Sequence, residues 1–255
     1  MNFLTAFHTD VGIKKKTNQD SLLIHQAQTD FGNVLLGVIC DGMGGLAKGE
    51  VASACMIRAF SEWFKTELPC MLSAGLQPEA LRTSWEQLVS DVDRKITDYS
   101  DRYNVSMGTT CAAILFVNDT YYIMNIGDSR IYLISENIYQ LTKDQTYVQR
   151  EMDAGRMTYE ESLTDPQRNV LLQCVGASPV IEPDFFIGDV KINQCYMICC
   201  DGFRHVIDAQ EFFSVLNPAT NNDAGTMQNN LVYLTELNKK RMETDNITAV
   251  LIRTY

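Results

Sequence analysis

Two short apolar runs in this chain end in the same way, and this repeated ending constrains the fold more than any other feature of the sequence. Residues 34–40 are almost wholly apolar, rich in branched side chains and too short for a globular helix, so they predict a buried strand. The run stops at Asp41, and three glycines follow within the next four residues. Residues 195–200 repeat the pattern and stop at Asp201-Gly202. Alone, such an ending favours a strand followed by an Asp-Gly turn, whereas its recurrence favours a shared site at strand ends.

Three further aspartates lie next to predicted strands. Asp20 comes directly before the strand-like residues 21–26, and Asp245 closely precedes the last predicted strand, at residues 247–253. Asp128 follows the strand at 120–126 through a glycine. Because strands that are consecutive in sequence usually pair antiparallel, the start of one and the end of its neighbour lie at one edge of the sheet. We therefore expect Asp20 to meet Asp41, and Asp201 to meet Asp245.

The remaining chain alternates between strand and helix patterns. Residues 48–68 and 78–101 carry apolar and aromatic side chains at steps of three and four, which predicts two helices whose striped faces belong to the core. On the first helix the expected stripe is Val51, Cys55, Ala59 and Trp63, widened by two phenylalanines. Further helices are predicted within 141–155, 158–161 and 224–242, and further strands at 3–11, 109–117, 131–134 and 185–190.

Composition limits the classes of partner. The chain has 255 residues, 45% of them hydrophobic, and no linker divides it, so we expect a single domain over residues 1–255 with a large core. Its net charge of −11 repels phosphate backbones, so nucleic acid is not an expected partner. No signal peptide is visible and no apolar run is long enough to span a membrane, so we expect a cytoplasmic protein with no membrane partner.

The cysteines favour a structural role. The chain has eight of them, and five lie inside apolar strand-like runs without disulfide-framework or zinc spacing. We expect these five to be buried, reduced thiols, namely Cys40, Cys111, Cys195, Cys199 and Cys200.

The strand-end aspartates point to metal chemistry. Carboxylates gathered at one edge repel one another unless some are protonated or a cation lies between them. All-oxygen ligands favour Mg²⁺ or Mn²⁺ over Zn²⁺. Two such ions, roughly 3.5–4 Å apart, activate a bridging water and clamp a phosphoryl group. No serine–histidine pairing or Walker-type loop in the sequence suggests another chemistry.

Seven short motifs follow one another along nearly the whole chain, namely Asn18-Gln19-Asp20, Asp41-Gly42-Met43-Gly44-Gly45, Gly108-Thr109-Thr110, Gly127-Asp128-Ser129-Arg130, Leu141-Thr142-Lys143-Asp144, Asp201-Gly202 and Asp245-Asn246. In their order and spacing these motifs resemble the metal-dependent serine/threonine protein phosphatases of type 2C, most closely the compact bacterial members.

The resemblance implies an α+β fold, a four-layer α/β/β/α sandwich of two mainly antiparallel sheets flanked by helices, with a flap at about residues 145–176. It implies removal of phosphate from phosphoserine and phosphothreonine of proteins by direct attack of metal-bound hydroxide. Two Mn²⁺ or Mg²⁺ ions are expected in the core site, with a weaker third. The implied metal ligands are Asp20, Asp41, the Gly42 carbonyl, Asp128, Asp201 and Asp245. The implied catalytic residues are Asp41, Asp201, Asp245 and Lys15.

Three positions depart from the family pattern. Lys15 stands where the family has a phosphate-binding arginine; it offers charge but no bidentate fork, and a solvated lysine loop is the alternative. Gln19 replaces a glutamate. Met43 replaces the histidine that some members offer as general acid, so metal-bound water would protonate the leaving group. His205, four residues after Asp201, is expected to be a surface or packing histidine.

Two other functions stay open. A non-catalytic fold relative acting as a regulatory binding protein is one, although the presence of Asp41, Asp201 and Asp245 argues against it. A phosphatase of a small phosphorylated molecule is the other, because substrate choice lies in surface loops. The expected partners of a protein phosphatase are phosphorylated proteins, including a serine/threonine kinase, and we expect a monomer.

Overall fold

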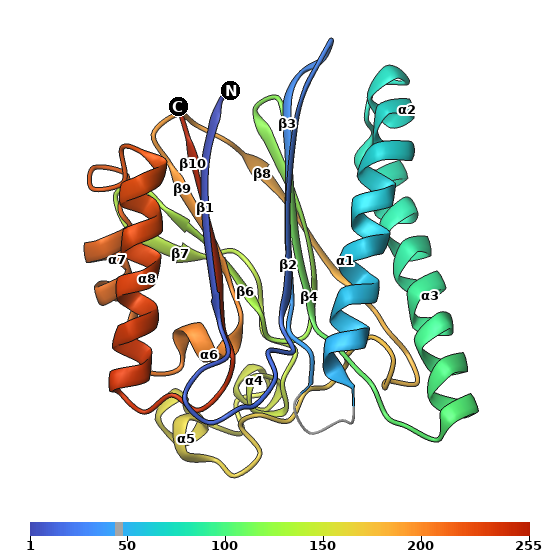
Figure 1. The fold of residues 1–255 in the computed structure, drawn as a ribbon, viewed down its shortest axis with the longest axis vertical. Helices are drawn as coiled ribbons and strands as arrows, with labels where there is room; N and C mark the ends of the chain where they lie inside the picture. The colour runs from blue at the N-terminus through green and yellow to red at the C-terminus, as the bar shows by residue number, and fades with distance from the viewer. Residues whose placement is uncertain (44–47) are drawn as a thin grey trace.

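Two five-stranded sheets lie face to face at the centre of the computed structural model, which describes residues 1–43 and 48–255 (Figure 1). All neighbouring strands pair antiparallel. The first sheet has the order β1 (Phe3–Asp10), β10 (Ile247–Thr254), β9 (Cys195–Cys199), β6 (Arg130–Ile134) and β7 (Ile138–Gln140). The second has the order β2 (Ser21–Thr29), β3 (Gly32–Cys40), β4 (Cys111–Val117), β5 (Thr120–Ile126) and β8 (Asp184–Asp189).

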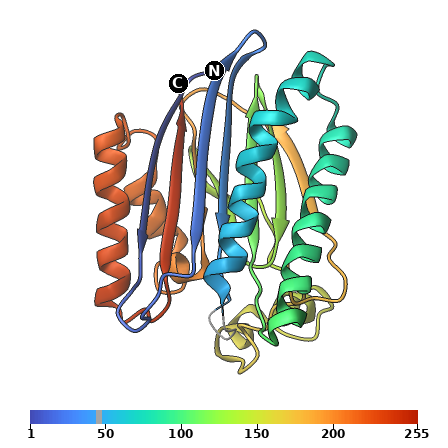
Figure 2. The same ribbon diagram turned by 45° about the vertical axis from the view of Figure 1, so that its right-hand side comes forward.

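Helices cover both outer faces, which completes the four layers and confirms the expected sandwich (Figures 1 and 2). The second sheet is covered by α1 (Gly49–Thr66), α2 (Leu68–Ser73) and α3 (Pro78–Tyr103), and the first by α6 (Asp201–Arg204), α7 (Ala209–Leu216) and α8 (Ala224–Lys240). Two short helices, α4 (Tyr147–Asp153) and α5 (Tyr159–Thr164), lie at the end of the sandwich opposite to the chain termini. None of the helices within the described residues has the length and apolarity needed to cross a bilayer.

Strand β3 shows why its sequence is apolar throughout. Leu35 and Ile39 point into the core between the sheets, whereas Leu36 and Val38 pack under the helices on the outer face. A strand buried on both faces needs no polar positions. At Gly37 the two sheets come close, because a Cβ there would lie 2.8 Å from Cδ1 of Ile198.

The buried face of α1 lies one residue beyond the expected stripe. Ala52, Met56, Phe60 and Trp63 are fully or almost fully buried, whereas the predicted Val51, Cys55 and Ala59 lie at the edge of this face. The face is wide because α1 packs on both the sheet and α3, where Trp85 meets Phe60 and Trp63 edge to face. Four short elements, β7, α2, α6 and α7, were not predicted, although Asp208 and Glu211 form a capping box at the start of α7.

The strand register places the start of one strand beside the end of its partner. Ser21 pairs with Cys40 at the end of the β2–β3 ladder, so Asp20 and Asp41 lie one residue beyond it on neighbouring strands. Ala249 pairs with Cys199, which sets the start of β10 beside the end of β9. Both strand pairs therefore bring their aspartates to the same end of the sandwich, near α4, α5 and α6 (Figure 1). The five cysteines expected to be buried thiols are buried and free.

Candidate metal centre

Asp20 and Asp41 form the middle of a cluster of carboxylates. One carboxylate oxygen from each, together with Sγ of Cys200, lies within 4.8 Å of the others. Both side-chain oxygens of Asp20 are buried without a hydrogen-bond partner. Buried carboxylate oxygens that lack donors are uncommon in proteins, and a hard cation is a partner that satisfies them.

Hydrogen bonds to the backbone of Asp41 hold this residue in place and leave its carboxylate oxygens available as ligands. Its amide donates to Thr110 Oγ1 (3.0 Å), and its carbonyl accepts from the Thr110 amide and from Thr109 Oγ1 (both 2.9 Å). Thr110 Oγ1 also lies 2.9 Å from Ser129 Oγ. The Gly108-Thr109-Thr110 and Gly127-Asp128-Ser129 motifs therefore support the strand end that carries Asp41.

Gly42 lies where a side chain has no room. A Cβ there would come within 2.4 Å of the Gln19 carbonyl oxygen and 2.5 Å of Gly49. Main chain from three segments meets at this point, so only glycine fits directly after Asp41. The expected role of Gly44 and Gly45 in the same motif falls outside the described residues.

Asp201 and Asp245 approach the cluster from the other sheet. Asp201 opens α6, and its Oδ1 is buried without a partner. Asn246 fastens the neighbouring loop, because its Oδ1 accepts from the Gln19 amide (2.9 Å) and its Nδ2 donates to the carbonyls of Val11 (3.0 Å) and Thr17 (3.2 Å). This loop carries Lys15, whose Nζ lies 2.8 Å from Asp245 Oδ1.

The cluster has the electrostatics of carboxylates crowded together. Burial, with the charges of Asp201 and Asp245, raises the pKa of Asp20 to about 7. Burial also raises the pKa of Asp41 well above its usual value, with contributions from Asp20, Asp201, Asp128 and Asp245. The structure thus brings together all five aspartates singled out in the sequence. Their crowded, partly unpartnered oxygens fit the divalent cations that oxygen ligands prefer.

Asp128, like Asp245, has a cationic partner, which here is a buried guanidinium. It follows Gly127, whose φ of +95° and contact with Thr110 exclude a side chain. Nη2 of Arg204 lies 2.9 Å from the Asp128 carbonyl oxygen and 3.3 Å from its Oδ2. Burial and the charge of Asp201, opposed by the charge of Arg204, raise the pKa of Asp128 to about 6. Sequence reasoning missed Arg204, although its place three residues after Asp201 was a usable signal.

His205 is exposed, as expected of a surface histidine, and it is also a neighbour of the cluster. Its Nε2 lies 3.5 Å from Asp201 Oδ2, and its Nδ1 lies 3.3 Å from Glu243 Oε2. The reason is helical spacing, since His205 lies one turn after Asp201. Glu243 in turn accepts from the amides of Thr244 (2.6 Å) and Asp245 (2.9 Å), which connects His205 to the chain that carries Asp245.

An open groove of about 1470 Å³ leads to the cluster. Asp128, Arg204, His205 and Asp245 line it, together with residues of α4, α5 and α7. Arg168, in the segment after α5, also lines it. An extended, charged substrate therefore has a path to the carboxylates.

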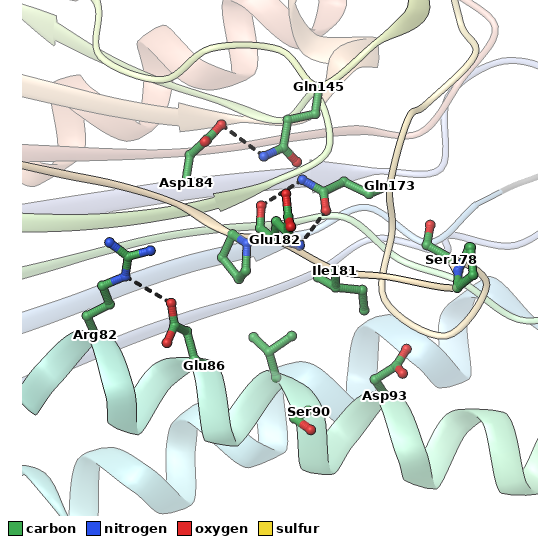
Figure 3. Close-up of a pocket in the computed structure, with 13 residues that line it drawn as sticks. Arg82, Glu86, Ser90, Asp93, Gln145, Gln173, Ser178, Ile181, Glu182 and Asp184 are labelled. Carbon is green, nitrogen blue, oxygen red and sulfur yellow. Dashed lines mark hydrogen bonds and ion pairs between the residues drawn. The ribbon is translucent and has the colours of Figure 1, made fainter.

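Figure 3 shows a second pocket, of about 800 Å³, between α3 and residues 173–184. Gln145 connects it with the cluster, because its Nε2 donates to Asp184 Oδ2 (2.9 Å) and its Oε1 accepts from the Gly127 amide (2.8 Å). This pocket therefore lies behind the turn that carries Asp128, and it contains none of the five clustered aspartates.

This chain is similar to the members of one protein family. The family model described as Protein phosphatase 2C matches residues 12–233. The serine/threonine phosphatase stp of Listeria monocytogenes serotype 4b (strain F2365) is 28% identical over 250 residues, which cover 96% of this chain and 94% of the relative.

Solved structures agree with the sequence comparison. The crystal structure of serine/threonine phosphatase Stp1 from Staphylococcus aureus is 28% identical, with a TM-score of 0.85 over 100% of this chain and 96% of that one. The catalytic domain of the serine/threonine protein phosphatase PstP, solved in complex with two manganese ions, is 27% identical, with a TM-score of 0.78 over 98% of this chain and 97% of that one.

Proposed function

The chain belongs to the protein phosphatase 2C family and is a serine/threonine protein phosphatase, and we propose that it removes phosphate from phosphoserine and phosphothreonine of proteins with two divalent ions, Mn²⁺ or Mg²⁺. The observation that carries the proposal is the set of buried oxygens of Asp20 and Asp201 that lack hydrogen-bond partners beside Asp41. The manganese ions in the related PstP structure support the same choice of metal.

Four aspartates and one carbonyl form the proposed ligand set for the two ions, namely Asp20, Asp41, Asp201, Asp245 and the carbonyl of Gly42. When bound, the ions supply positive charge that lowers the pKa of water and offsets the charge of the phosphoryl group. The threonine clamp on the Asp41 backbone holds this carboxylate in position without using its oxygens. A ligand that needs no reorganisation is what such chemistry requires.

The third ion expected from the sequence does not fit its donor set. Asp128, its expected ligand, already has a guanidinium nitrogen 3.3 Å from its carboxylate. We therefore propose no role for a third ion.

Lys15 has the proposed role of binding the substrate phosphate. Burial tends to lower its pKa, but the hydrogen bond to Asp245 and the charges of Asp41 and Asp201 raise it overall, so the side chain carries its positive charge. A phosphate bound beside the carboxylates needs such a donor, because the cluster itself is anionic. Met43 offers no proton, so this residue cannot act as general acid.

The groove indicates how substrates reach the site. We propose that residues 145–176 act as a flap at its side, within a single catalytic domain over 1–255. The size and polar lining of the groove suit a phosphorylated protein segment, including one from a serine/threonine kinase. Cytoplasmic location and a monomeric state belong to the same proposal. The family names favour protein substrates over the alternatives of a small phosphorylated molecule or a regulatory binding protein.

The test is phosphate release from a phosphothreonine peptide and from para-nitrophenyl phosphate, each with manganese, with magnesium and with excess EDTA. We expect turnover that depends on the metal and disappears on chelation. Full activity in chelated, metal-free protein would contradict the two-ion centre. Turnover of para-nitrophenyl phosphate without turnover of phosphopeptides would favour a small-molecule substrate, and no turnover of either would favour the binding protein.

A further inference from the structure

A buried cation lies beside Asp128. The side chains of Arg204 and Asp128 are each only 11% exposed, and Nη2 of Arg204 contacts both the carbonyl oxygen (2.9 Å) and Oδ2 (3.3 Å) of Asp128. Two contacts from one nitrogen to the same residue hold the guanidinium at this carboxylate. A charge with so little access to water persists only beside an opposite charge.

The neighbouring ion pair between Arg130 and Asp144 determines which carboxylate the charge of Arg204 balances. Asp144 accepts two hydrogen bonds from Arg130, at 2.7 Å each from Nε and Nη2. Nη2 of Arg204 reaches Asp144 Oδ2 at only 3.5 Å, which is a weaker contact. Because Arg130 already balances Asp144, the charge of Arg204 is left to balance Asp128.

The short helix α6 positions Arg204 beside the carboxylate cluster. It begins at Asp201, and Arg204 follows at the spacing that places two side chains on the same side of a helix. Its Nε is buried without a hydrogen-bond partner. Arg204 therefore keeps its position at the expense of one of its own donors, which indicates that the attraction to Asp128 and Asp144 determines the position.

We infer that the guanidinium of Arg204 takes the place of a third divalent ion beside Asp128, so that this protein holds two metal ions and supplies the next positive charge from its own chain. A divalent cation at Asp128 would have to displace Arg204 or lie beside it against like-charge repulsion. The inference rests on the proposed two-ion centre. It adds that the centre of this chain is complete with two ions and that Arg204 sets this limit.

Crystals of wild type and Arg204→Gln, soaked in manganese and measured at the manganese absorption edge, test the inference. The wild type should show two anomalous peaks, near Asp41, with none at Asp128. Arg204→Gln should gain a third peak at Asp128, because the change removes the cation and leaves Asp144 paired with Arg130. A third peak in the wild type, or only two in Arg204→Gln, would overturn the inference.

Two matched variants separate the charge of Arg204 from its location. Arg204→Lys keeps a cation at the position and should retain two ions. Arg241 lines the same groove but pairs with Glu211, so Arg241→Gln removes an equal charge away from Asp128 and should also retain two. A third ion in Arg241→Gln would show that general groove charge limits metal binding, which contradicts a specific role for Arg204.

Manganese titration of the wild type and Asp128→Asn by calorimetry covers the case in which Arg204→Gln does not fold. Both proteins should bind two ions, with dissociation constants within about threefold, because Asp128 holds no ion. Loss of one ion in Asp128→Asn would overturn this inference but would not contradict the proposed two-ion centre. Binding of fewer than two ions by the wild type would instead contradict the proposed two-ion centre.

Discussion

The ammonium of Lys15 lies 2.8 Å from a carboxylate oxygen of Asp245, and this pair joins the β1–β2 loop to the start of the last strand. The same oxygen accepts a hydrogen bond from the amide of Asn246 (2.8 Å). Lys15 and a metal ion bound by Asp245 would both interact with the same carboxylate. The pair therefore links substrate binding and metal binding through a single side chain.

Lys15→Ala should weaken kcat/KM by about ten- to a hundredfold, since a hydrogen bond to a charged group contributes roughly 1.5–3 kcal/mol. Removal of the competing cation should at the same time tighten manganese binding. Steady-state kinetics on a phosphothreonine peptide and calorimetric titration measure the two effects. Lys15→Arg should retain or improve activity, because a guanidinium pairs with two phosphate oxygens.

Lys14→Ala and Lys16→Ala are the controls, because they remove the same charge from the same loop. Small, equal losses in all three alanine variants would show that the loop acts through diffuse charge alone. In that case Lys15 would have no special place in the site.

Asp41→Asn should lower kcat at least about a hundredfold while the fold is retained, since groups that act on developing charge contribute on that order. In chelated protein at neutral pH the same variant should melt at a higher temperature than the wild type, because it removes a carboxyl group that is destabilised first by burial and then by the charges of Asp20, Asp201, Asp128 and Asp245. Near-normal turnover would mean that the proposed ligand set is incorrect. Circular dichroism melting with EDTA checks the second effect.

The strand-end aspartates were predictable because one local rule fixes their meeting. Apolar runs that stop at Asp41 and Asp201 define strand ends, and antiparallel pairing of sequential strands then gives the register, as the pairing of Ser21 with Cys40 confirms. Resemblance to a known family supplied the layer order. Neither step depends on details of side-chain packing.

The cationic surroundings of the cluster were not predictable in the same way. Arg204 meets Asp128 across 76 residues of sequence, and the contact depends on the short helix α6, on the positive φ of Gly127 and on the Arg130–Asp144 pair. His205 meets Glu243 through the same helix. Such contacts arise from the relative placement of three elements, which no periodicity in the sequence encodes.

The stability of chelated protein should fall with rising pH through Asp20. Its pKa is raised to about 7 in the folded state from an ordinary value of 3.8, so the folded state binds the proton more tightly. The stabilisation from this proton is fully present below about pH 4 and is lost as the pH rises through about 7. Urea unfolding of wild type and Asp20→Asn between pH 4 and 8, with EDTA, isolates this contribution. The wild type should lose about 2–4 kcal/mol more than the variant over this range, and parallel curves for the two proteins would contradict the assignment.

Arg130→Gln should lower the free energy of unfolding by about 3–5 kcal/mol, because it leaves the carboxylate of Asp144 buried with only the distant nitrogen of Arg204. The hydrogen bonds from Arg130 also hold the pKa of Asp144 below its usual value against the opposing effect of burial. A lowered pKa gives stability that is present above the unfolded value of 3.8 and is lost as the pH falls through the folded one.

Urea unfolding at pH 7 measures the loss, with Arg82→Gln as the control. Arg82 forms an exposed ion pair with Glu86, so its removal should cost no more than about 1 kcal/mol. The double variant Arg130→Gln/Asp144→Asn should be more stable than Arg130→Gln alone, because the second change removes the unpaired buried charge. Equal losses in the single and double variants would show that Arg130 stabilises the fold through packing and not through its charge.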